Sequence, residues 1–236
     1  VLVDHVNTNA GSHLFEQQRC EDWPSAPLES YFIDGSQTFE TDISGIVKLA
    51  EQSISVAQQT KRQKCHISSL RIALQCGGSD AFSGITGNPL AGQAVRLLLK
   101  EGGSALLAET DELLGAAESY ILSGVRDRKV GEDFLQKVAD FQGHAEKRGH
   151  SAEGNPSGGN KYRGLYNIAL KSLGAAMKKH PNVVLGGVLG YSQKWDPSCG
   201  GYYFMDSPGN DLESIAGQVA CGCNLIYFIT GTYSIN

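Results

Sequence analysis

Strand-like and helix-like segments alternate along most of this chain, and the alternation is the feature that most restricts its fold. Short apolar runs are followed by longer segments in which apolar residues recur every three or four positions. We expect strands at 1–6, 70–75, 104–108, 183–189, 202–205 and 224–230, and helices at 38–61, 91–100, 113–123, 131–148, 164–179 and 212–220. Such alternation is typical of a mostly parallel sheet covered by helices on both faces. The sequence therefore predicts an α/β, Rossmann-like three-layer fold whose strand-end loops form the site.

The size and charge of the chain exclude some classes of protein. Its 236 residues, 41% of them hydrophobic, are enough for a complete core. We expect residues 1–236 to form a single α/β domain of catalytic type, with a helical insert at 112–150. Both ends fall at strand-like segments, so we expect a fragment of a larger chain whose other domains would be its partners. The net charge is -5 and the basic residues are scattered. Nucleic-acid binding needs a concentrated basic face, so we exclude it.

The cysteines and apolar segments favour a reducing compartment. The six cysteines do not resemble the dense framework of a small disulfide-stapled domain. No secretory signal opens the chain, and no apolar run approaches the ~20 residues of a membrane helix. We therefore expect a cytoplasmic protein that does not bind membranes. A homo-oligomer is compatible with the sequence, which does not define the oligomeric state.

The loop after the strand at 70–75 is the densest group of polar residues. Residues 76–89 contain four glycines, a thiol, a carboxylate, three hydroxyls and the amide of Asn88. Loops at the carboxyl ends of parallel strands are where open α/β sheets bind ligands. Cys76 and Asp80 lie four residues apart, and a thiolate with a carboxylate can bind Fe²⁺. Alternatively, Asp80 caps the next helix and Cys76 is a small buried apolar residue.

A second loop begins at Glu109, directly after an apolar strand. A carboxylate at a strand end is a candidate general base or metal ligand. Its neighbours Asp111 and Glu112 are better explained as members of the first turn of the next helix, where negative charge is favourable.

Two more polar loops, the third and the fourth along the chain, are candidates for the site. Residues 154–161 look like a P-loop, but Asn160 separates Lys161 from the last glycine and no Ser or Thr follows, so we exclude nucleotide binding there. Backbone amides before a helix, together with Lys161, can still bind a carboxylate. In the fourth loop, Asp206 follows a strand and is a functional candidate, whereas Asp211 can be a helix N-cap.

Four long segments carry a family resemblance. They are 75–86 (QCGGSDAFSGIT), 154–161 (GNPSGGNK), 164–174 (GLYNIALKSLG) and 205–211 (MDSPGND). Together they resemble the altronate/galactarate dehydratases, a family of sugar-acid dehydratases. The resemblance extends from about residue 70 to the end of the chain, and more loosely from residue 30. It corresponds to the main C-terminal portion of the family's longer members.

The resemblance implies a metal-dependent loss of water from a hexonate or hexarate, giving a 2-keto-3-deoxy acid. Removing the proton beside a carboxylate requires stabilisation of the developing negative charge by a cation or oriented donors. A base must take this proton, and an acid must assist the leaving hydroxyl. If the site lies between domains, this segment alone can be inactive.

The motifs do not assign individual roles, and the following assignments are hypotheses. The candidate catalytic residues are Glu109, Asp206 and Asp80. The candidate metal ligands are Cys76, Asp80 and Glu109, with Fe²⁺ as the favoured ion and Mn²⁺ as the alternative. The candidates for binding the hydroxyls and carboxylates of the substrate are Gly77, Gly78, Ser79, Asn88, Asn155, Ser157, Asn160, Lys161, Ser207 and Asn210.

Two other functions fit the same loops. One is a sugar-acid-binding module that has lost the chemistry, and a bound transition metal would argue against it. The other is a related lyase that acts on sulfolactate, where sulfite rather than water is the leaving group.

Overall fold

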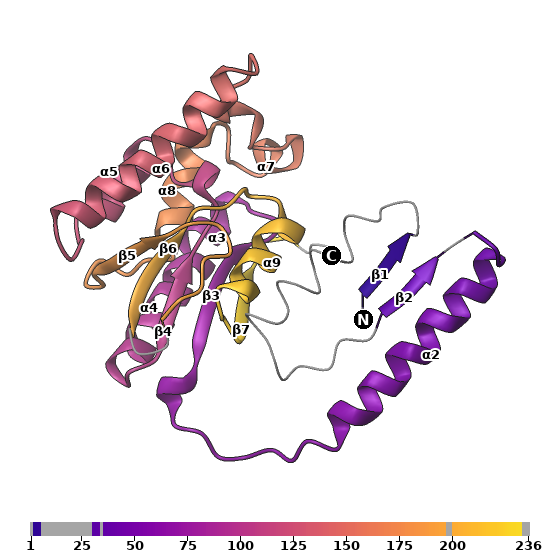
Figure 1. The fold of residues 1–236 in the computed structure, drawn as a ribbon. Coiled ribbons are helices and arrows are strands. Elements are labelled where there is room, and N and C mark those ends of the chain that lie inside the picture. The colour runs from indigo at the N-terminus through magenta and orange to yellow at the C-terminus, as the bar shows by residue number, and fades with distance from the viewer. Residues whose placement is uncertain (1, 6–29, 34, 197–199, 233–236) are drawn as a thin grey trace. The chain divides into compact units, whose positions relative to one another are not determined.

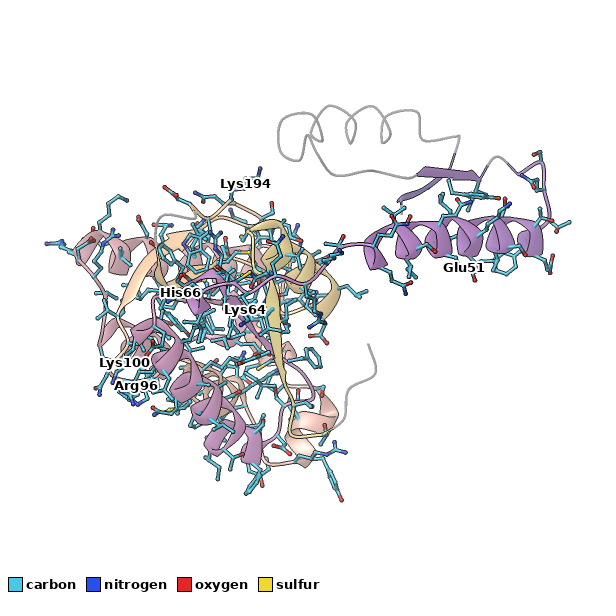
Figure 2. The ribbon with its side chains drawn as sticks, turned by 90° about the horizontal axis from the view of Figure 1, so that it is seen from below. Glu51, Lys64, His66, Arg96, Lys100 and Lys194 are labelled. Atoms are coloured by element: carbon cyan, nitrogen blue, oxygen red, sulfur yellow. The ribbon has the colours of Figure 1, made fainter. Side chains whose placement is uncertain are left out.

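The computed structural model of the protein describes residues 2–5, 30–33, 35–196 and 200–232. The chain forms two compact units, residues 1–64 and 65–236, where the sequence analysis expects one domain. The division follows a polar connection, residues 60–64 (TKRQK), which has no apolar residue to bury. Figure 2 shows Glu51 in the first unit and Arg96 and Lys100 in the second.

The first unit contains a strand pair and a long helix. Strand β1 (Leu2–His5) pairs in parallel with β2 (Ser30–Ile33). Helix α2 (Phe39–Gln58) begins at Thr38, whose hydroxyl accepts a hydrogen bond from the Thr41 amide at 3.3 Å. The Tyr31 hydroxyl on β2 donates to the Asp42 carboxylate on α2 at 3.0 Å. The sequence predicts β1 and α2 but misses β2, which lies at the end of a polar segment.

The second unit is built on a parallel sheet of five strands in the order β5-β6-β4-β3-β7 (Figure 1). The strands are β3 (Arg71–Cys76), β4 (Ser104–Leu107), β5 (Leu185–Leu189), β6 (Gly201–Met205) and β7 (Leu225–Ile229). Leu107 is paired with Phe204, and Leu74 with Leu107, so β3, β4 and β6 end close to the same line. This sheet confirms the predicted α/β class.

Helices cover both faces of this sheet. One face packs against α4 (Gly87–Lys100), α5 (Ala116–Leu122), α6 (Arg128–Glu146) and α8 (Ile168–Ala176). The other face packs against α9 (Asp211–Ala220) and the segment around Trp195. Successive strand residues point to opposite faces, so Leu74 joins the first core and Ala73 the second. Helices α5 and α6 fall within 112–150, the expected helical insert.

Two short helices that the sequence analysis treats as loops stand beside the strand ends. Helix α3 (Ala81–Ile85) is capped by Asp80, and α7 (Gly158–Tyr162) is capped by Ser157, which lies in the predicted loop 154–161. Single turns of 3-10 helix occur at η1 (Ile67–Ser69), η2 (Thr110–Glu112) and η3 (Ala152–Gly154).

Two predicted helices are shorter than expected. Helix α8 begins at the Asn167 cap rather than at residue 164, because Gly164 has φ of 95°. Helix α5 begins after Gly115, which has φ of 64° and also leaves the helical region. Within the described residues, no helix combines the length and apolarity needed to cross a membrane.

Candidate functional site

Three parallel strands bring their polar ends to one edge of the sheet. Cys76 is the last residue of β3, Glu109 follows β4 by two residues, and Asp206 follows β6 directly. Because all three strands run in the same direction, their following loops lie at the same edge. The structure thus brings together the first, second and fourth of the loops singled out by the sequence.

A buried cluster of two carboxylates and a thiol forms the centre of this edge. One ligand atom each from Cys76, Glu109 and Glu112 lies within 4.8 Å of the others. The exposed fractions of these residues are 4%, 0% and 3%. Cys76 and Glu109 were predicted metal ligands, and Glu112 replaces the third predicted ligand, Asp80, in this group. The 3-10 turn η2 brings Glu112 there, whereas the sequence favoured a place for it in the first turn of the next helix.

Both carboxylate oxygens of Glu109 are fixed by hydrogen bonds. Oε1 accepts a hydrogen bond from Nε2 of Gln75 at 2.8 Å, and Oε2 accepts one from the Cys76 amide at 2.9 Å. The backbone of Glu109 has φ of 68°, a left-handed conformation that side chains other than glycine adopt rarely. Strain of this kind is common at functional sites, where surrounding contacts hold it in place.

Two lysines neutralise the carboxylates of the cluster. Nζ of Lys178 lies 2.7 Å from Oε2 of Glu109, and Nζ of Lys171 lies 2.8 Å from Oε1 of Glu112. Lys171 is on α8 and Lys178 lies just beyond its end. Buried charges are stable only when paired in this manner, so helix α8 and the cluster depend on each other.

Burial and mutual charge shift the proton affinities of this cluster. Burial, reinforced by Glu112, raises the pKa of the Cys76 thiol and also that of Glu109, although Lys178 opposes the shift at Glu109. For Glu112, burial acts to raise the pKa, but the charges of Lys171 and Lys178 outweigh it and hold this pKa below its ordinary value. Burial opposes the charge of Lys178, but Cys76, Glu109 and Glu112 together raise its pKa well above the ordinary value. Glu112 is therefore the more firmly ionised of the two carboxylates.

The donor set of the cluster fits a divalent transition metal. Thiolate and carboxylate donors together suit an ion such as Fe²⁺. Oε2 of Glu112 is buried and has no hydrogen-bond partner in the part of the chain that the structure describes, which leaves this oxygen free to bind a cation. The Cys76 thiol would have to lose its proton on binding, and its raised pKa makes metal binding dependent on pH.

A closed ring of buried hydrogen bonds holds Glu109 from the α9 side of the sheet. Gln75 donates to Glu109 and accepts from Nε2 of Gln218 at 2.8 Å. Nε2 of Gln218 also donates to the Ser214 hydroxyl at 3.1 Å, which lies 3.2 Å from the Ser207 hydroxyl. Oγ of Ser207 accepts from the Glu109 amide at 3.1 Å and closes the ring. Ser207, a predicted substrate-binding residue, is buried here and positions Glu109.

A second network links the third loop to the cluster. Nδ2 of Asn155 donates to Oδ2 of Asp111, and Nζ of Lys171 donates to Oδ1 of Asn155 at 2.5 Å. Lys171 thereby connects Asn155 with Glu112. Burial and the nearby Glu112 raise the pKa of Asp111 to about 6. The loop that looks like a P-loop therefore contributes an amide that bridges Asp111 and Lys171, one step away from the cluster.

Asp206 lies at the more open side of the same edge. Its Oδ1 accepts a hydrogen bond from the Thr110 hydroxyl at 2.7 Å, and its Oδ2 lies 3.4 Å from Nζ of Lys137. One third of the Asp206 side chain is exposed. Asp206 is therefore accessible in a way that Glu109 is not.

Asp80 lies outside the metal-type cluster. Its carboxylate accepts a hydrogen bond from the Ser83 amide at 2.6 Å, and the Ser83 hydroxyl in turn accepts from the Asp80 amide at 3.1 Å. This reciprocal pair caps α3, which was the alternative reading of Asp80. Asp211, also considered as a cap, is the first residue of α9 and accepts from Nε2 of Gln75 at 3.0 Å; Asn210 is the cap.

The other predicted substrate-binding residues divide between backbone support and exposed positions. Ser157 and Asn160 cap α7, and Nδ2 of Asn160 also donates to the Ser79 carbonyl at 2.7 Å. Nδ2 of Asn88 donates to the Gly174 carbonyl at 2.8 Å. Gly77 and Gly78 continue the pairing of β3 with the segment after β7, whereas Lys161 and Asn210 are exposed.

Sequence reasoning missed four residues of the cluster and its supports: Glu112, Lys171, Lys178 and Gln218. Lys171 and Lys178 are seven residues apart in a mostly apolar segment, a spacing that places two side chains on one face of a helix. That pattern could have identified them. Gln218 has no comparable signal, because a lone glutamine on an amphipathic helix is ordinary.

Comparison with known proteins identifies the family of this chain. The family model for the C-terminal part of D-galactarate/altronate dehydratases matches residues 67–235. The chain belongs to this family. The predicted resemblance is thereby confirmed, and the match covers the sheet, α8 and all the residues of the cluster.

Three relatives show what this chain is similar to. An altronate dehydratase of Bacillus subtilis is 34% identical over 97% of this chain and 49% of its own length. A galactarate dehydratase (L-threo-forming) of Escherichia coli is 31% identical over 89% of this chain and 40% of its own length. The beta subunit of a (2R)-sulfolactate sulfo-lyase of Chromohalobacter salexigens is 28% identical over 87% of this chain and 52% of its own length. The chain thus spans about half the length of these relatives or less.

Proposed function

We propose that this chain forms the sheet domain of a hydro-lyase that removes water from a hexonate or hexarate, such as altronate or galactarate. The buried cluster of Cys76, Glu109 and Glu112, in a chain whose relatives include named dehydratases, carries the proposal. The product would be a 2-keto-3-deoxy acid. Further domains, as in the longer relatives, would complete the enzyme.

The reaction needs three groups in the site: a base, an acid and a positive charge. A base takes the proton from the carbon beside the carboxylate, and the hydroxyl on the next carbon leaves with a proton as water. The resulting enol then becomes the 2-keto acid by moving one proton from oxygen to carbon. Negative charge develops on the carboxylate during the first step, so a nearby positive charge lowers the barrier.

The buried cluster is suited to holding the positive charge that stabilises the developing negative charge. Cys76, Glu109 and Glu112 would hold a divalent metal, with Fe²⁺ favoured and Mn²⁺ as the alternative. When bound, the metal supplies a Lewis acid that stabilises the developing charge. Lys178 and the Gln75 amide hold the Glu109 carboxylate in one orientation, and Lys171 does the same for Glu112.

The open side of the site is suited to moving the proton. Asp206 is partly exposed and receives a hydrogen bond from Thr110, which is adjacent in sequence to Glu109. We assign proton transfer with the substrate to Asp206, whose Oδ2 lies 3.4 Å from Nζ of Lys137. A thiol ligand needs reducing conditions, and the buried Cys76, Cys221 and Cys223 are free thiols, so we place the protein in the cytoplasm.

A metal-dependent assay with matched variants tests the proposal. The protein is incubated with altronate and galactarate, with and without Fe²⁺ or Mn²⁺, and formation of the 2-keto acid is followed. Glu112→Gln and Cys76→Ala should lower both bound metal and activity by at least about tenfold. Glu132→Gln, an exposed carboxylate on α6, is the control and should change neither. Full activity of both cluster variants would refute the metal assignment.

A sulfo-lyase is the second candidate, because one relative is named a (2R)-sulfolactate sulfo-lyase. Including sulfolactate in the same assay, with detection of sulfite, separates the two reactions. A protein that binds sugar acids without converting any of them would instead support the non-catalytic module.

A further inference from the structure

A groove of about 750 Å³ lies beside the cluster, between α6 and the loop that joins β6 to α9. Its volume is within the range of small-molecule sites. Thr110, Asp206 and Ser207 line its inner end, and His144, Arg148 and Tyr191 are among the residues that line the rest. The assignment below rests on the proposed function and deepens it.

The inner end of the groove adjoins the Glu109 cluster. Thr110 follows Glu109 in the sequence, and its hydroxyl accepts a hydrogen bond from the Ser207 amide at 3.1 Å while donating to Asp206. Ser207 also accepts from the Glu109 amide. A molecule lying in the groove with its reacting end at Asp206 would therefore reach the edge where the cluster lies.

One face of α6 runs along the groove and carries basic side chains. Lys137, Phe141 and His144 are spaced by four and three residues and share this face, and Arg148 follows two residues beyond the end of α6. Lys137 is engaged with Asp206 at the inner end. From Phe141 to Glu146, where α6 ends, the helical rise is about 7 Å and Arg148 lies beyond this end, a length that suits an extended six-carbon chain.

Arg148 offers a carboxylate-binding group at the outer end. Its Nη1 donates to the His144 carbonyl at 3.3 Å, and among the described residues no carboxylate forms an ion pair with its guanidinium. A guanidinium binds a carboxylate through two parallel hydrogen bonds, and His144 can donate a third. The acidic groups along the groove are Asp140, Glu213 and Asp206, and such oxygens accept hydrogen bonds from hydroxyls.

We propose that this groove binds the body of the sugar acid, with Arg148 and His144 holding the carboxylate farthest from the reacting carbon. The acidic side chains between the two ends accept hydrogen bonds from the substrate hydroxyls. An acid with a carboxylate at both ends, a hexarate, satisfies this arrangement fully. A hexonate ends in a neutral hydroxyl and leaves Arg148 without its partner.

Kinetics with two substrates test the assignment. In the intact protein, Arg148→Gln should lower kcat/KM for galactarate by at least about tenfold, mainly through KM, because a charge-assisted pair is lost. The value for altronate should change by less than about twofold, and Arg148→Lys should recover part of the galactarate activity. Arg128→Gln, an exposed arginine at the first residue of α6, is the control.

Equal losses for both substrates, or no loss for either, would overturn the assignment. Calorimetric measurement of galactarate binding distinguishes a failure of the groove assignment from a failure of the hydro-lyase proposal. If no sugar acid is dehydrated but galactarate binds more tightly to the parent than to Arg148→Gln, the groove assignment stands and the hydro-lyase proposal fails. If Arg148→Gln binds galactarate as tightly as the parent, the groove assignment fails.

Discussion

Nζ of Lys178 lies 2.7 Å from Oε2 of Glu109, and the exposed fractions of these side chains are 1% and 0%. The same oxygen accepts a hydrogen bond from the Cys76 amide, so the ion pair is joined to the end of β3. The pair therefore links three parts of the fold: the end of β3, the turn after β4 and the segment after α8. Mutation of either partner separates the structural role of the pair from its role in the chemistry.

Replacing Lys178 with methionine should be strongly destabilising. The change leaves Glu109 buried without its positive partner, and breaking one side of a buried pair costs about 3–5 kcal/mol of unfolding free energy. Urea denaturation of the metal-free protein measures this. The double variant Lys178→Met with Glu109→Gln should recover much of the loss, since it removes both charges. Lys129→Met, which breaks an exposed pair with Asp133, is the control and should leave the midpoint nearly unchanged. Equal destabilisation by both single lysine variants would contradict the argument.

The hydrogen-bonded ring predicts a distinct phenotype for Gln218. Methionine at this position keeps the volume but removes the donor to Gln75 and Ser214, leaving buried oxygens without partners. We expect a loss of about 1–3 kcal/mol of unfolding free energy. We also expect a lower kcat with little change in KM, because the Glu109 carboxylate loses orientation rather than contact with substrate. Gln136→Met, which removes an exposed hydrogen bond to Asp140, is the control. An unchanged kcat would show that the ring does not position Glu109.

Asp111 predicts a pH dependence of stability. Its pKa is raised by burial and by Glu112 from 3.8 to about 6, so the folded protein binds its proton more tightly than the unfolded chain does. The associated stabilisation is fully present below pH 3.8 and is lost as the pH rises through about 6. Relative to Asp111→Asn, the parent should therefore lose about 3 kcal/mol across this window. Denaturation of both proteins at several pH values, with chelator present, measures the difference. If the difference in unfolding free energy between the two proteins stays constant with pH, the pKa of Asp111 is not raised by folding.

Much of the sheet unit follows from local sequence patterns. The segment 70–75 is bounded by polar residues and predicts β3 within one residue at each end. Helix α9 is likewise predicted at 212–220 and observed at Asp211–Ala220. The short helices α3 and α7 were missed because five residues carry no periodicity. Their caps, Asp80 with Ser83 and Ser157 with Asn160, were the available signals.

Only the part of the site that depends on strand direction could be predicted from the sequence. Glu109 and Cys76 meet because each ends a parallel strand, and this can be inferred from the alternation of elements. Glu112 joins them through the 3-10 turn and the left-handed backbone of Glu109, a conformation that no sequence pattern indicated. The two lysines reach the cluster through the packing of α8, and packing of this kind is a tertiary property.

Gly209 tests how tightly the fourth loop packs against the cluster's supports. A Cβ at this position would lie 2.7 Å from Oδ2 and 2.8 Å from Oδ1 of Asp111, too close without movement. Because Asp111 is held by Asn155, Gly209→Ala should displace that network and cost about 1–3 kcal/mol of unfolding free energy. Activity should fall as well, since Asn155 also contacts Lys171. Gly154→Ala is the matched control in a neighbouring loop, because its Cβ would meet no atom within 4 Å. Thermal denaturation and the sugar-acid assay on both variants measure these effects. Equal melting temperatures and equal activities of the two variants would show that the loop moves to accommodate the added Cβ without cost.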